Sequence, residues 1–125
     1  MLLLLHHFIV IGLTAALLTG LNSAHAASTD QYQVQCLQDD ATACYTLGEA
    51  YYKGTDVEQS DQQALKYYTK ACNLDNGLAC SKLGLMYYQA QGVEQDYNKA
   101  AELIAKGCDL DDDFSCTVLG MLYSE

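Results

Sequence analysis

Cysteine is the residue type of this 125-residue chain with the widest chemistry, because a thiol can bind a metal, exchange electrons or form a disulfide. The spacing does not suit the first two roles, since the chain has no Cys-x-x-Cys redox motif and its gaps are too long for a zinc site. We therefore expect structural disulfides, no metal and no cofactor. The cysteines form three pairs, each with a step of eight residues: Cys36 and Cys44, Cys72 and Cys80, Cys108 and Cys116.

The three histidines, His6, His7 and His25, would be the natural activators of a serine or cysteine nucleophile. All three lie in an N-terminal segment that we expect to be removed, so no histidine would remain for catalysis or metal binding. No serine begins the Ser-x-x-Lys motif of penicillin-recognising enzymes. The most that the residues offer an enzyme is a hydroxyl, such as that of Ser81 or Tyr52, near a lysine or a carboxylate.

Residues 1–26 have the pattern of a secretory signal peptide. An apolar run over residues 8–21 is followed by Ala24-His25-Ala26, the small-x-small ending that signal peptidase cleaves. A retained membrane anchor over residues 2–21 is the alternative. Cleavage would leave residues 27–125 in the periplasm or outside the cell, where disulfides persist, with no contact with the membrane.

The charge balance restricts the partners of this protein. Sixteen acidic residues against six lysines give a net charge of -10, which excludes a nucleic-acid binder and favours a basic partner. The carboxylates of Asp39-Asp40 and Asp111-Asp112-Asp113 could do acid-base chemistry. Their place before the expected helices makes helix capping the favoured role, and their spacing is not that of a calcium loop.

A period of 36 residues organises the rest of the chain, with two full copies over 36–71 and 72–107 and a partial copy over 108–125. Three copies share Leu47/Leu83/Leu119, Gly48/Gly84/Gly120 and Tyr51/Tyr87/Tyr123. Cys44, Leu47, Gly48 and Tyr51 have helical spacing, and Ala64, Tyr67, Tyr68 and Ala71 predict a second helix in the same copy. Each copy therefore reads as helix, turn, helix, and residues 29–37 predict a leading second helix.

The ends and contacts of these helices can also be predicted. Ser60-Asp61 and Asp96 can cap the second helices, and Gly54 can end the first helix of the first copy in a left-handed conformation. Such helix pairs are too thin to bury their apolar faces alone, so the copies must stack into an all-α solenoid. The small residues Gly48, Gly84, Ala64 and Ala100 are the expected points of close helix contact.

Two disulfide pairings fit this repeat. The first joins the two cysteines of each pair. The second joins Cys44 with Cys72 and Cys80 with Cys108, which leaves Cys36 and Cys116 separated by the whole stack. A disulfide needs Cα atoms within about 7 Å, so we expect the local pairing. Closing a loop of about nine residues stabilises the fold by roughly 2.5 kcal/mol in the chain-entropy model.

The Leu-Gly-x-x-Tyr run, the Val-Glu-Gln turn, the alanine that follows it and the 36-residue period resemble Sel-like repeats, which are relatives of the tetratricopeptide repeat. The cysteine pairs are similar to those of the cysteine-rich Hcp subfamily, whose members are secreted. The resemblance implies a right-handed α-solenoid of stacked helix-turn-helix repeats over residues 29–125. It also implies an alternative function, penicillin binding with weak β-lactamase activity, and hence a β-lactam or a peptidoglycan-like small molecule as ligand.

Residues that vary between the copies are free to serve a partner. By resemblance, the first helices line a concave groove, so one stripe on them would face a bound peptide or protein. The alternative to a binding role is that these residues only pack against their neighbours or face the solvent. The stripe consists of Tyr45, Glu49, Tyr52, Ser81, Leu85, Tyr88, Thr117 and Met121, and continues to Ser124.

The partial third copy predicts an apolar helix without a following second helix. Either one face of this helix packs inward, or its exposed edge docks another subunit in self-association. The residues concerned are Val118, Leu119, Met121, Leu122 and Tyr123.

Overall fold

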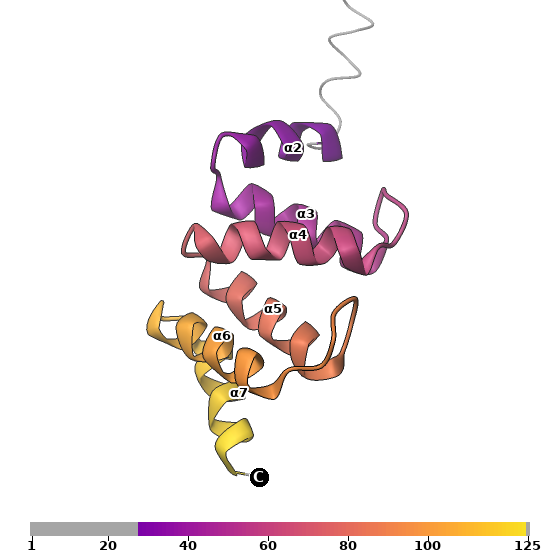
Figure 1. Ribbon diagram of the computed structural model, residues 1–125. Coiled ribbons are helices and arrows are strands. Elements are labelled where there is room, and N and C mark those ends of the chain that lie inside the picture. Colours follow the sequence, from indigo (N-terminus) through magenta and orange to yellow (C-terminus); the bar gives the residue numbers. More distant parts are fainter. Residues whose placement is uncertain (1–27, 125) are drawn as a thin grey trace, which may run out of the picture.

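The computed structural model describes residues 28–124; the expected signal peptide, residues 1–26, lies outside this part of the chain. Six helices and no strand form the described part, and the helices follow one another along a single stack (Figure 1). This confirms the predicted all-α solenoid. The helices are α2 (Thr29–Leu37), α3 (Ala41–Lys53), α4 (Asp61–Asn73), α5 (Gly77–Gln89), α6 (Tyr97–Asp109) and α7 (Asp113–Ser124).

The helices begin where a short polar side chain can cap them. Asp40 accepts a hydrogen bond from the Ala43 amide at 3.0 Å, and Asp96 accepts one from the Lys99 amide at 2.9 Å. Ser60, Asn76 and Asp112 cap α4, α5 and α7 in the same way. Each cap contributes about 1 kcal/mol by satisfying an amide that the helix leaves free. The predicted capping role of the acidic turns is thus confirmed at Asp40, Asp96 and Asp112.

The first helices end in a left-handed residue. Gly54 ends α3 with φ 71°, as predicted, but Ala90 ends α5 with φ 55° at the equivalent repeat position. A side chain with a Cβ is strained in this conformation, whereas glycine is not. The short turns from second to first helices also use a left-handed residue, the aspartates Asp39, Asp75 and Asp111.

Close packing holds the two helices of a repeat together. A Cβ added to Gly48 of α3 would lie 2.5 Å from the ring of Tyr68 in α4, and one added to Gly84 of α5 would lie 2.7 Å from Ile104 in α6. Ala64 and Ala100 are fully buried on the same second helices. These four small residues are the close contacts predicted from the sequence.

Disulfides join each second helix to the first helix that follows it. The bonds link α2 to α3, α4 to α5 and α6 to α7, with Cα–Cα distances of 4.7, 4.6 and 4.5 Å. The local pairing is therefore confirmed. Glycine contacts within repeats alternate with covalent bonds between repeats, so the stack has a short-range link at every step. The bonds are Cys36–Cys44, Cys72–Cys80 and Cys108–Cys116.

Candidate functional site

Three residues of the predicted stripe meet on one face of α3. Tyr45, Glu49 and Tyr52 surround the ring of Tyr68, which comes from α4 and is fully buried. The ring centroid of Tyr68 lies 6.0 Å from that of Tyr45 and 6.4 Å from that of Tyr52. The two half-exposed tyrosines are therefore braced by a third tyrosine beneath them. We call this group, with Glu49, the tyrosine cluster.

Glu49 anchors the tyrosine cluster electrostatically. Its carboxylate accepts a 2.6 Å hydrogen bond from the Tyr68 hydroxyl, pairs with Lys53 one helical turn away and lies 3.6 Å from Lys82 of α5. Burial opposes the ionisation of Glu49, but the hydrogen bonds from Lys53 and Tyr68 and the charge of Lys82 outweigh it and lower its pKa. Glu49 is thus a carboxylate held in place from two helices.

The environment of the cluster raises the pKa of two of its phenols, Tyr68 and Tyr45. Burial, followed by the hydrogen bond to Glu49, raises the pKa of Tyr68 far above its ordinary value. Burial and the charge of Glu49 raise the pKa of Tyr45 to about 12, and Asp112 adds to this effect. Asp112, which caps α7, is therefore close enough to Tyr45 to contribute to its electrostatics.

The stripe continues unevenly over α5 and α7. Leu85 and Tyr88 are half-buried, and Tyr88 packs edge-on against Tyr97 of α6 at 5.2 Å. Thr117 and Met121 are exposed on α7. The stripe thus differs along its length: its residues are half-buried on α5 and exposed on α7.

Ser81 does not belong to an accessible surface. Its side chain is fully buried, and its hydroxyl has no hydrogen-bond partner among residues 28–124. Ser81 occupies in α5 the repeat position that Tyr45 has in α3. Its side chain is small and the neighbouring helices cover it, so a ligand on the face could not reach it. The hydroxyl of Tyr52, the other group considered for catalysis, donates to Gln91 at 3.2 Å. Neither hydroxyl is placed beside a base in the described part of the chain.

In the sequence, Tyr68 served only to predict the second helix of the first copy. Its repeat position holds Ile104 in the next copy, where no polar atom needs a partner. The tyrosine at a repeat position that is aliphatic in the next copy could have indicated a polar contact, because a buried phenol hydroxyl requires an acceptor. The acceptor turns out to be Glu49, which has Leu85 at the equivalent position of α5.

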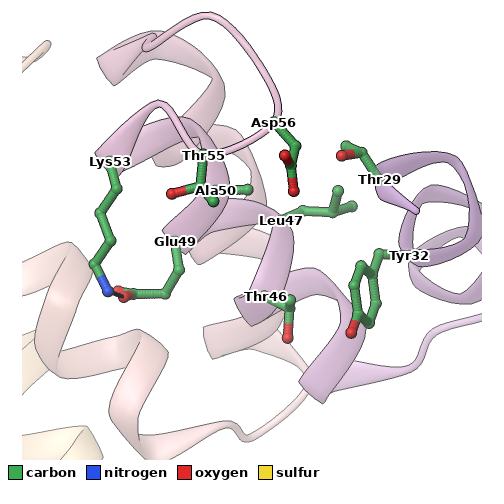
Figure 2. A pocket seen from close by; sticks show the side chains of 9 residues that line it. All are labelled: Thr29, Tyr32, Thr46, Leu47, Glu49, Ala50, Lys53, Thr55 and Asp56. Atoms are coloured by element: carbon green, nitrogen blue, oxygen red, sulfur yellow. Dashed lines mark ion pairs between the residues drawn. The ribbon is translucent and has the colours of Figure 1, made fainter. Parts of the chain in front are cut away.

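A small pocket adjoins the tyrosine cluster, with a volume of about 220 Å³. Figure 2 shows Thr29 and Tyr32 of α2 on one side of it and the Glu49–Lys53 ion pair on the far side of α3. Its volume is below the roughly 300–1,000 Å³ of sites that enclose a small molecule. A single side chain of a partner would fit better than a whole ligand.

The described residues offer recognition groups rather than a metal centre. Over residues 28–124 no three His, Cys, Asp or Glu side chains are grouped to hold a metal ion, and every cysteine is in a disulfide. In the same stretch, none of the helices has the length and apolar character needed to span a bilayer. The face can stack aromatic groups and hydrogen-bond them through phenols and one fixed carboxylate.

Solved structures show the same fold in bacterial repeat proteins. Helicobacter pylori cysteine rich protein B is 28% identical, with a TM-score of 0.70, over 73% of this chain and 68% of its own. A Sel1 repeat protein from Oxalobacter formigenes and a protective antigen of uropathogenic Escherichia coli with an SLR fold are each 26% identical, with TM-scores of 0.71. They match 76% and 75% of this chain, which spans only 39% and 20% of their lengths.

No curated protein matches this chain. The family model of the Sel1 repeat matches it twice, over residues 41–76 and 77–112, each match beginning at a first helix and ending in the turn after a second helix. These two matches cover more than half of the 125 residues. The chain therefore belongs to the Sel1 repeat family, and its helix-linking disulfides make it a Sel-like repeat protein of the cysteine-rich Hcp type.

Proposed function

We propose that this protein is an exported binding module that holds a basic peptide or protein segment against the face formed by α3, α5 and α7. The observation that carries the proposal is the tyrosine cluster: two half-exposed tyrosines, fixed by a buried third tyrosine and an anchored carboxylate. The residues of the proposed surface are Tyr45, Glu49, Tyr52, Leu85, Tyr88, Thr117 and Met121.

The tyrosine cluster supports binding because it is ordered before a partner arrives. Tyrosine and tryptophan dominate the binding energy of many interfaces, since a rigid ring loses little conformational entropy when it is covered. Tyr45 and Tyr52 lose still less, because Tyr68 already restrains both rings. Tyr68 of α4 and Lys82 of α5 hold the carboxylate of Glu49, so the polar part of the cluster is also fixed.

Electrostatics supports a basic partner. The protein carries a formal net charge of -10, and the turn that begins α7 contributes three consecutive aspartates, Asp111-Asp112-Asp113. The charge of Asp112 contributes to the raised pKa of Tyr45, which supports an acidic environment around the tyrosine cluster. Lysine and arginine side chains would be attracted to such a face and could also stack on its rings.

The disulfides support export. Three formed disulfides are typical of an oxidising compartment, and the apolar run before Ala24-His25-Ala26 would direct the chain there. Mass spectrometry of the protein recovered from the periplasm tests this step. A chain beginning at Ala27 is expected, and an intact N-terminus in the membrane fraction would contradict it.

The binding function can be tested by selecting peptides from a displayed random library with the oxidised protein as the target. We expect enriched peptides to carry lysine or arginine beside an aromatic residue. Tyr45→Ala and Tyr52→Ala should each weaken the selected peptide about tenfold or more, as central aromatic contacts do. Val34→Ala, at an exposed apolar position on α2 outside the face, is the matched control and should leave affinity unchanged.

Salt provides the second measurement. Raising the salt from about 50 to 500 mM should weaken binding, because charges across the interface are screened. The proposal would be contradicted if the selection enriched acidic peptides, or if neither Tyr45→Ala nor Tyr52→Ala changed the affinity.

A further inference from the structure

The last described helix, α7, has an open place for another helix. In the two full repeats, the glycine of the first helix is covered by the second helix: Gly48 by Tyr68, and Gly84 by Ile104. A Cβ added to Gly120, the equivalent residue of α7, would meet nothing within 4 Å. The surface around Gly120 thus repeats an internal packing surface that no described residue covers.

The helices that fill this place inside the protein share a pattern. Each second helix presents a small residue and, four positions later, a large one that lies on the glycine: Ala64 and Tyr68 in α4, Ala100 and Ile104 in α6. The residues 36 positions earlier are Ser28, which caps α2, and Tyr32, which lies within α2. Tyr32 is half-buried beside α3 and the turn that follows it, and the described residues supply no first helix before α2.

The two ends of the stack are also the apolar ends. Six large hydrophobic side chains are exposed among residues 28–124, and five of them lie on α2 and α7. Each of these helices carries a single charged residue, Asp30 in α2 and Asp113 in α7. The ends can therefore approach each other with little of the repulsion expected from the net charge. The five side chains are Val34, Leu37, Phe114, Met121 and Tyr123.

We propose that α7 packs against α2 of a second copy of this protein, so that copies join head to tail as a continued solenoid. Gly120 receives Tyr32 of the second copy as Gly48 receives Tyr68 within one chain. The two surfaces are different, so the contact does not close on itself and a third copy can add to either end.

The joint between copies is weaker than a joint inside the chain. Inside, Lys70 pairs with Asp39 at 3.2 Å and Lys106 with Asp75 at 3.8 Å, linking each second helix to the turn before it. At the joint, the equivalent residues are Val34 and Asp111, which cannot form an ion pair. The internal joints have no disulfide, but a turn of the chain connects their two helices, and the joint between copies lacks this covalent connection. Association is therefore reversible and depends on concentration.

Light scattering and sedimentation equilibrium of the oxidised protein, from about 1 to 500 µM, test the proposal. The weight-average mass should rise with concentration. Gly120→Leu should remain monomeric, because its side chain occupies the space of Tyr32. It should fold normally, since Gly120 faces open space in the monomer, and circular dichroism verifies this.

Val34→Lys is the complementary variant. It restores the lysine found at the two internal joints and should strengthen association about two- to fivefold, in the range of a surface ion pair. The gain should vanish in 0.5 M salt. Val34→Asp, which places a second acidic group beside Asp111, should weaken association.

A mixing experiment separates head-to-tail assembly from pairing of identical ends. Gly120→Leu protein keeps an intact α2 end, so adding it to the wild type should cap chains and lower their average mass. A wild-type protein that is monomeric throughout would overturn the proposal. The proposal would also be overturned if Gly120→Leu still associated, or if Val34→Lys and Val34→Asp associated as strongly as the wild type.

Discussion

Replacing the repeat glycine by alanine should have opposite effects in different copies. Gly48 and Gly120 occupy the same position of the repeat, but only Gly48 lies under a neighbouring helix. An added Cβ at Gly48 would stand 2.5 and 2.6 Å from two ring carbons of Tyr68, closer than side chains approach one another. The ring must move, and its 2.6 Å hydrogen bond to Glu49 moves with it.

The expected loss for Gly48→Ala is about 2–4 kcal/mol in the free energy of unfolding. Overpacking a core costs about 1–3 kcal/mol. Weakening a buried hydrogen bond to a charged group costs about 1.5–3 kcal/mol. The better helix propensity of alanine returns about 1 kcal/mol. At Gly120 only this last effect remains in the monomer, so Gly120→Ala should stabilise by about 0.5–1 kcal/mol.

Urea unfolding followed by circular dichroism measures both variants, with the disulfides intact and the protein dilute enough to be monomeric. Gly84→Ala is a further member of the series and should destabilise, because its Cβ would lie 2.9 Å from the Ala100 carbonyl oxygen as well as 2.7 Å from Ile104. Equal changes in sign and size at Gly48 and Gly120 would refute the reasoning, since they would show that helix propensity outweighs the contact.

Three other predictions concern pH, backbone strain and the disulfides. The lowered pKa of Glu49 means that the folded protein releases this proton at a lower pH than the unfolded chain, whose glutamates titrate near pH 4.3. The free energy of unfolding should therefore fall as the pH falls below the pKa of the unfolded glutamate and through the lower pKa of folded Glu49. Glu49→Gln should make the urea midpoint depend less on pH between about pH 3 and 6. Ala90→Gly should stabilise the protein by about 0.5–1 kcal/mol, because it relieves a left-handed alanine at φ 55°. Gly54→Ala, the same exchange in reverse, should destabilise it by a similar amount. The Cys108–Cys116 bond should be reduced first by limiting dithiothreitol, because Cys116 is exposed whereas the cysteines of the other two bonds are buried; pulse alkylation and peptide mass mapping give the order.

Each of these predictions has a clear contrary result. An unchanged acid limb in Glu49→Gln would show that its carboxylate is equally basic in the folded and unfolded chains. A loss of stability in Ala90→Gly would mean that flexibility of the unfolded chain outweighs the strain. Simultaneous reduction of all three bonds would indicate that the stack opens as one unit before any disulfide is reached.

The repeat itself was predictable because its signals are local. The 36-residue period, the leading helix over residues 29–37 and the caps at Ser60 and Asp96 depend on residues a few positions apart. The disulfide pairing followed from the same period, because a nine-residue loop brings its ends together whatever lies outside it. Ser81 was predicted less well. Periodicity put it in the groove, but its burial depends on which neighbouring helices cover it.

The sequence by itself determined the helices, their order and the covalent links between them, because capping, helical periodicity and short loops act within about one repeat. Only the tertiary structure decided that two of the three equivalent glycines, Gly48 and Gly84, are covered by a second helix. It also decided that Glu49 is held by Tyr68 and Lys82 from two different helices. These properties arise from atoms far apart in the chain that meet when the repeats stack. Identical residues in identical repeat positions therefore differ: Gly48 lies in the core, and no described residue covers Gly120.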